Sequence, residues 1–139
     1  DEIACELRTQ NKSGRQWIAL PIDSNQNWGA ASTQLVHALM DEHAIAVLAL
    51  DRDSSHLSEQ LALKAFVPVL AVSNDKTLTS ANVPWIFRLP EGASLDQSVC
   101  CLMQAAEEAG ANRALVRVRL ASGEPASGLR FDSRGEPQY

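Results

Sequence analysis

The stretch "AIAVLALDRDSSHLSEQLALKAFVPVLAV", residues 44–72, decides the fold of this chain. It begins and ends with apolar runs, 44–50 and 67–72, that lack the polar alternation of a half-exposed strand. Such runs are typical of parallel strands that are covered on both faces. The segment between them has helical apolar spacing. Its residues expected to point inward are Leu57, Leu61, Leu63 and Phe66. The stretch therefore predicts strand, helix and strand.

The same alternation continues on both sides of this stretch. A preceding helix starts near residue 27, where Asn25 or Asn27 can cap it. Its apolar residues recur at steps of three and four: Trp28, Ala31, Leu35, Val36, Leu39 and Met40. A third apolar strand is expected over 84–89, followed by a helix over 95–109 that Gly110 ends. Alternating strands and helices predict an α/β fold, a three-layer α/β/α sandwich with a mainly parallel sheet.

The two ends of the chain have weaker patterns. We expect a short helix over 3–9 and a strand over 16–22, which Pro21 places at a sheet edge or strand end. Residues 113–120, "RALVRVRL", alternate Arg with apolar side chains and predict a half-exposed strand. Residues 121–139 are rich in Gly, Pro, Ser and charge, which predicts a loop or loosely attached tail. A single α/β domain is therefore expected over 1–120.

Composition excludes several classes of protein. A chain of 139 residues with 45% apolar content is expected to form one domain. The net charge of −5 leaves no basic stripe for a nucleic-acid partner. No apolar run approaches the roughly 20 residues that span a bilayer, so no membrane span is expected. Cys5, Cys100 and Cys101 form neither a metal-ligand spacing nor an even disulfide framework.

Catalytic motifs are missing from the sequence. His37, His43 and His56 show no H-x-x-x-H spacing, which argues against a metal site. No G-x-S-x-G elbow occurs, and no G-x-G-x-x-G follows a strand, so neither an esterase-type triad nor dinucleotide binding is indicated. Cys100 and Cys101 lie within a predicted helix, where packing explains them. We therefore expect a non-enzymatic protein without a cofactor.

Small polar residues follow two of the predicted strands. Residues 51–55 come after the strand 44–50, and residues 73–77 come after the strand 67–72. The carboxyl ends of parallel strands meet at one edge of a sheet, where ligands usually bind. Residues 23–26 are expected on the same rim. Helix capping and turn formation alone would also explain such clusters.

Residues 13–92 resemble the amino-terminal lobe of the type I periplasmic binding proteins, in the leucine/isoleucine/valine-binding or extracellular ligand-binding receptor group. The resemblance rests on the order of these elements: Gly14-Arg15, 30–39, 44–50, Ser54-Ser55, Val67-Pro68, 73–79 and Phe87-Arg88. It implies a receptor-like domain related to the substrate-binding proteins of ABC transporters for amino acids or similar small polar molecules. It also implies a periplasmic or extracellular location.

The resemblance further implies which residues hold the carboxylate and ammonium of an amino-acid-like ligand. They are Ser54, Ser55, Ser73, Asn74 and Thr77. Short polar side chains between a strand end and a helix N-terminus are also suited to an anion. The chain departs from the family in placing Asp51, Asp53 and Asp75 on this rim, since three carboxylates would repel a ligand carboxylate.

Two larger departures concern missing parts. The family's central first strand has no counterpart ahead of Ile3, so we expect residues 113–120 or a partner chain to fill its place. The family's second lobe is also missing, so a second lobe, a subunit or a domain of a longer protein should complete the site. A lone lobe should bind ligand no better than about millimolar.

An alternative is a protein-interaction or signalling domain of flavodoxin or receiver architecture without its own ligand. A receiver needs a Lys at the end of a later strand, whereas the strand before Pro90 ends without one.

Overall fold

The computed structural model describes Ile18, Leu20 and Ile22 and residues 27–80, 84–90, 92, 95–110, 112–122, 130–132 and 134–138. The helix expected over 3–9 lies outside these residues. Of the strand expected over 16–22, only the three single residues are described.

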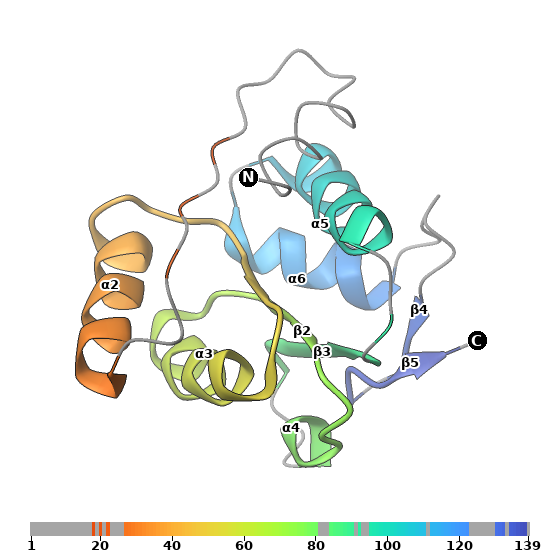
Figure 1. Ribbon diagram of the computed structural model, residues 1–139. Coiled ribbons are helices and arrows are strands. Elements are labelled where there is room, and N and C mark those ends of the chain that lie inside the picture. The colour runs from red at the N-terminus through yellow and green to blue at the C-terminus, as the bar shows by residue number, and fades with distance from the viewer. Residues whose placement is uncertain are drawn as a thin grey trace.

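Among the described residues, three parallel strands form the main sheet (Figure 1). They are β1 (Val47–Ala49), β2 (Val69–Val72) and β3 (Ile86–Leu89), in that spatial order. All residues of β2 and β3 are buried, as their apolar runs predict, and the one charged residue among them is Arg88 in β3. The predicted α/β class is therefore confirmed, with strands shorter than the apolar runs that contain them.

Five helices accompany the sheet in the described part of the chain. They are α2 (Trp28–Met40), α3 (Arg52–Ala65), α4 (Thr77–Ser80), α5 (Leu95–Ala109) and α6 (Arg113–Ser122). Asn27 caps α2, because its side-chain oxygen accepts a hydrogen bond of 2.9 Å from the backbone N–H of Ala30. The bounds of α5 are those that its apolar stripe predicts.

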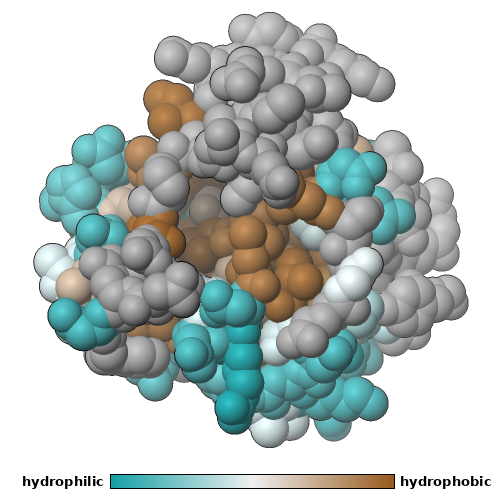
Figure 2. All heavy atoms as spheres, viewed as in Figure 1, coloured by the Kyte–Doolittle hydropathy of each residue, from teal (hydrophilic) through white to brown (hydrophobic). Residues whose placement is uncertain are grey.

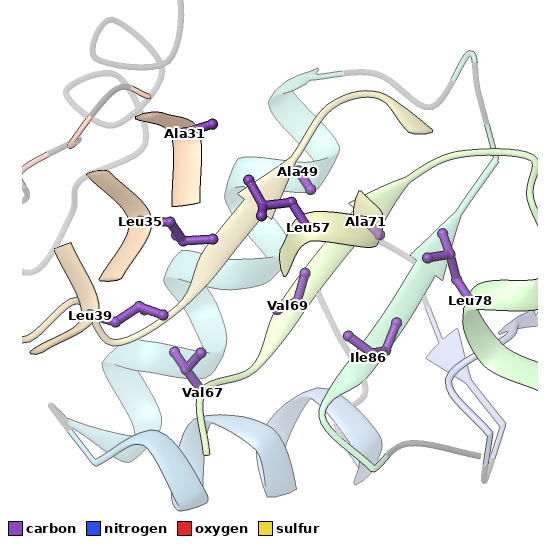
Figure 3. Packing of buried hydrophobic residues seen from close by; sticks show 10 residues of the cluster. All are labelled: Ala31, Leu35, Leu39, Ala49, Leu57, Val67, Val69, Ala71, Leu78 and Ile86. Atoms are coloured by element: carbon purple, nitrogen blue, oxygen red, sulfur yellow. The ribbon is translucent and has the colours of Figure 1, made fainter. Parts of the chain in front are cut away.

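Successive residues of β2 enter two different apolar clusters, because side chains alternate across a strand. Val69 and Ala71 pack with residues of α2 and α3, including Leu35 and Leu57 (Figure 3). Leu70 and Val72, on the other face of β2, belong to a second cluster with residues of α5 and α6. That cluster includes Leu70, Val72, Phe87, Leu89, Cys101, Ala105, Val116 and Leu120. Each face of β2 thus contributes to a separate core.

The prediction of a strand over 113–120 is wrong, because these residues form α6. Val116 and Leu120 are buried four positions apart, whereas Val118 between them is exposed. This burial has helical rather than alternating period. Asn112 precedes the helix, and its side-chain oxygen accepts a 3.1 Å hydrogen bond from the N–H of Leu115. Residues 113–120 therefore do not pair with β1.

Part of the expected loose tail is structured. β4 (Arg130–Phe131) and β5 (Pro137–Gln138) form an antiparallel pair, which we call the C-terminal hairpin, residues 130–138. The ring of Phe131 is buried against Phe87, with centroids 5.2 Å apart. This packing partner lies in β3, far away in the sequence, so local composition gave no sign of it.

Some apolar residues that were expected to face inward are exposed. Val36 and Met40 are 41% and 51% exposed, because the buried stripe of α2 passes through Leu35 and Leu39 instead. Phe66 is 63% exposed and has φ of 53°. It ends α3 in the left-handed conformation where Gly is usual, and this turns the ring outward beside Trp85.

Candidate functional site

The carboxyl ends of β1 and β2 lead into two polar loops. We call residues 51–55, which include the first turn of α3, the first loop, and residues 73–80, which include α4, the second loop. In the first loop, Asp51 and Ser54 bond each other reciprocally at the start of α3. The Ser54 N–H donates to Asp51 Oδ1 at 2.7 Å, and the Asp51 N–H donates to Ser54 Oγ at 3.3 Å. This pattern satisfies backbone donors at a helix start, so capping accounts for both residues.

Ser55 is turned away from solvent. Its side chain is fully buried, and its hydroxyl donates to the Asp51 carbonyl oxygen at 2.6 Å. A ligand could reach this hydroxyl only by replacing that hydrogen bond. Ser54 is partly exposed, although its hydroxyl also donates to the Asp51 carbonyl at 3.2 Å.

Ser73 anchors the second loop to the sheet. Its N–H donates to the Leu89 carbonyl at 2.8 Å, and its buried hydroxyl accepts from the Asp75 N–H at 3.1 Å. Asp75 Oδ1 in turn accepts from the N–H and the hydroxyl of Thr77, at 3.0 and 2.6 Å. Asn74 and Thr77 are exposed. The second loop is therefore a network of short-range hydrogen bonds with two of its polar residues facing solvent.

The two loops meet at Asp75. Its Oδ2 accepts hydrogen bonds from Arg52 Nε at 3.1 Å and from His56 Nε2 at 2.8 Å, both on α3. His56 Nδ1 also lies 3.5 Å from a carboxylate oxygen of Glu59. The sequence prediction that the two polar clusters lie side by side on one rim is therefore confirmed. The pattern gave no sign of the residues that join them, Arg52 and His56.

The hydrogen bonds at Asp75 keep its carboxylate ionised. The Thr77 hydroxyl, followed by His56, the Thr77 N–H and Arg52, holds the pKa of Asp75 far below its ordinary value. The guanidinium of Arg52 therefore offsets the charge of one of the three carboxylates expected to repel a ligand. Asp51 and Asp53 are exposed on the same rim.

A buried arginine lies behind the second loop. Arg88, in β3, is 5% exposed and donates from Nη1 to the Ser73 carbonyl at 2.8 Å. Its Nε and Nη2 donate to the two carboxylate oxygens of Glu136 at 2.7 and 2.6 Å. The Thr79 hydroxyl also donates to Glu136. Chiefly because of Arg88, the pKa of Glu136 falls from 4.5 to about 2.

Sequence reasoning missed this pair. An arginine in an otherwise apolar strand is a sign of a buried partner, because an unpaired buried guanidinium is costly. Arg88 gave that sign, but nothing local pointed to Glu136.

The serine hydroxyls of the rim form hydrogen bonds with backbone groups. The hydroxyls of Ser54 and Ser55 donate to a backbone carbonyl, and that of Ser73 accepts from a backbone N–H. None of these three hydrogen bonds joins a serine to a histidine, as an activated serine requires. Within the described ranges, no group of three or more His, Cys, Asp or Glu side chains could hold a metal ion. No helix in the described part of the chain is long and apolar enough to cross a membrane.

Comparison with known proteins gives no relative. A scan of protein-family models finds no match, and searches of curated proteins and of solved structures find none.

Proposed function

We propose that the chain is a non-enzymatic, receptor-like domain that binds a small polar ligand at the rim of its sheet. It would be related to the amino-acid-binding proteins of ABC transporters. In this proposal the fold is a three-layer α/β/α sandwich, equivalent to one lobe of a type I periplasmic binding protein. The resemblance of residues 13–92 and the geometry of the rim support it together.

One observation carries the proposal: the two polar loops converge at Asp75. Arg52 and His56 reach across from α3 to this carboxylate, so both loops lie within one hydrogen-bonded network. The network lies at the carboxyl ends of adjacent parallel strands, the usual ligand position in such sheets. Capping alone explains the first loop, but it does not explain the bonds between the two loops.

The five residues of the candidate site would have two roles. Ser54, Asn74 and Thr77 are partly or fully exposed and would contact the ligand directly. Ser55 and Ser73 are buried and would support the loops from below. The exposed carboxylates of Asp51 and Asp53 suit the ammonium group of an amino-acid-like ligand.

A further subunit, lobe or domain would complete the site. Within the described part of the chain, β1 has a strand partner only in β2, so its other edge has none. Figure 2 shows hydrophobic residues gathered in the middle of this face, between the positions of α2 and α5 in Figure 1. Leu50, which directly follows β1, is 47% exposed. A strand from a partner chain beside β1 would cover apolar surface and pair the open edge.

Isothermal titration with a panel of amino acids, amides and small carboxylates tests the proposal. A lone lobe leaves most of the ligand exposed, so the expected Kd is about 1 mM or weaker. Ser54→Ala and Ser73→Ala should weaken binding at least about fivefold, which is about 1 kcal/mol. Gln60→Ala, an exposed change on the same helix as Ser54, is the matched control.

Three outcomes would contradict the proposal in different ways. Micromolar affinity in a proven monomer would show that the rim is not half of a site. Binding that neither serine variant changes would show that the ligand occupies another place. A melting temperature unchanged by the whole panel would favour the interaction-domain alternative.

A further inference from the structure

We infer that Glu136, in the C-terminal hairpin, is a positioning residue that holds the second loop from outside the rim. Two hydrogen-bonded routes lead from its carboxylate to the two ends of that loop. Thr79 bonds Glu136 directly, and Arg88 bonds both Glu136 and the carbonyl oxygen of Ser73. A single carboxylate, 57 residues from Thr79 in the chain, therefore fixes both ends of the loop.

The orientation of Arg88 depends on Glu136. The guanidinium uses Nε and Nη2 for the carboxylate, which leaves Nη1 directed at Ser73. This two-point pairing fixes the plane of the guanidinium, which one hydrogen bond alone would not do. Because the arginine side chain is only 6% exposed, water cannot readily replace the carboxylate. Loss of the charge on Glu136 should therefore disturb the bond from Arg88 to Ser73.

The hairpin holds Glu136 in place through contacts of its own. Phe131 packs against Phe87, and the carbonyl oxygen of Gly135 accepts a 2.7 Å hydrogen bond from the Arg88 N–H. The Glu136 N–H also donates to Asp132 Oδ1 at 3.0 Å. Glu136 is thus fixed by backbone and aromatic contacts before its carboxylate meets Arg88, as a supporting residue must be.

The consequence for binding rests on the proposed function of the rim. If the second loop holds ligand, affinity depends on a residue that does not touch the ligand. Glu136→Gln keeps the size of the side chain but places an amide N–H₂ where Arg88 needs an acceptor. It should release the Ser73 end of the loop while leaving the first loop and α3 as they are.

Amide hydrogen exchange without ligand tests this directly. Glu136→Gln should speed exchange at least about tenfold at Asp75, Leu78 and Ser80, whose N–H groups are bonded within the loop. Exchange at Val47 and Ser55, bonded in β1 and α3, should speed no more than the loss of overall stability accounts for, as measured by urea unfolding of the same variant. Arg134→Ala is the matched control, because Arg134 is an exposed residue of the same hairpin.

Thr79→Val provides a milder second variant if Glu136→Gln does not fold. It removes only the Thr79 hydroxyl, which bonds Glu136 and also lies 3.3 Å from the Lys76 carbonyl oxygen, and it should speed exchange at Thr79 and Ser80 alone. The inference would be overturned if amide exchange became faster by the same factor at all amides, or if it did not become faster in the second loop. Faster exchange in the loop with unchanged ligand affinity would support the positioning role and count against the rim as the ligand site.

Discussion

Glu136 and Arg88 lie 48 positions apart in the chain, and both oxygens of the carboxylate meet the guanidinium. This pair makes stability depend on pH with a definite sign. The folded-state pKa of Glu136 is lowered from 4.5 to about 2, so its contribution is fully present above about pH 4.5. The contribution is lost as the pH falls through about 2.

Glu136→Gln should therefore destabilise the protein by about 3 kcal/mol at pH 7, since breaking a buried ion pair leaves Arg88 uncompensated. The difference from the unsubstituted chain should shrink below about pH 4.5 and vanish near pH 2. Urea unfolding at pH 7, 4 and 2 measures it. A difference independent of pH would show that the carboxylate charge is not what stabilises this contact.

Gly135 should tolerate no side chain. It has φ of 86°, and a Cβ there would lie 2.0 Å from the carbonyl oxygen of Ile86. Gly92 has φ of 94° but nothing within 4 Å of such a Cβ, which makes it a matched control for backbone strain. Gly135→Ala should cost at least about 2 kcal/mol more than Gly92→Ala. Thermal melts of the two variants check this, and equal losses would show that the hairpin does not pack so closely on β3.

The helical period of α6 predicts a contrast between two valines. Val116 is fully buried, whereas Val118 is 43% exposed. Val116→Ala should destabilise by about 2 kcal/mol, from two lost methyl groups and the space left behind. Val118→Ala should change stability by less than about 0.5 kcal/mol. Similar losses from both, measured by urea unfolding, would favour a strand, in which both residues share a face.

Arg113 should not be replaceable by lysine. Its Nε and Nη1 donate to the carbonyls of Ala44 and Ala65, at 2.8 and 3.2 Å, and its Nη2 donates to that of Leu39. A lysine ammonium cannot match this planar set of donors. Arg113→Lys should cost about 2 kcal/mol, and Arg119→Lys on the exposed side of α6 should cost almost nothing. Calorimetric melts would separate them, and equal effects would contradict a special role for Arg113.

Much of the fold follows from local patterns. The apolar runs around Leu48, Leu70 and Phe87 predict the three strands, because only covered strands remain apolar on both faces. Asn27 and Gly110 predict helix ends through capping chemistry that involves only neighbouring residues. These features need no knowledge of distant contacts, so they can be deduced from a single sequence.

The wrong predictions of secondary structure and burial concern segments whose sequence pattern fits two structures. In residues 113–120, apolar positions alternate, but Val116 and Leu120 are also one helical turn apart. A short segment satisfies both periods, and packing against α5 decides between them. Val36, in α2, and Phe66, at the end of α3, are apolar, but this alone does not show which side of each helix meets the sheet.

The rim could be predicted only in part. Asp51, Ser54 and Asp75 are polar residues at strand ends, and parallel strand ends meet by geometry. The groups that organise the rim come from elsewhere: Arg88 from within a strand and Glu136 from a segment whose composition predicted a loop. Long-range ion pairs have no fixed sequence spacing, so the fold must be known first.

Arg113 has a thermodynamic consequence for the whole molecule. It starts the helix that supplies Val116 to one apolar cluster, and its guanidinium binds the ends of α2 and α3, which supply Leu39 and Leu57 to the other. Unfolding of either apolar cluster should therefore weaken the hydrogen bonds of Arg113 that connect it to the other cluster. Calorimetric and van't Hoff enthalpies of unfolding should then agree, because the two cores melt in a single cooperative transition.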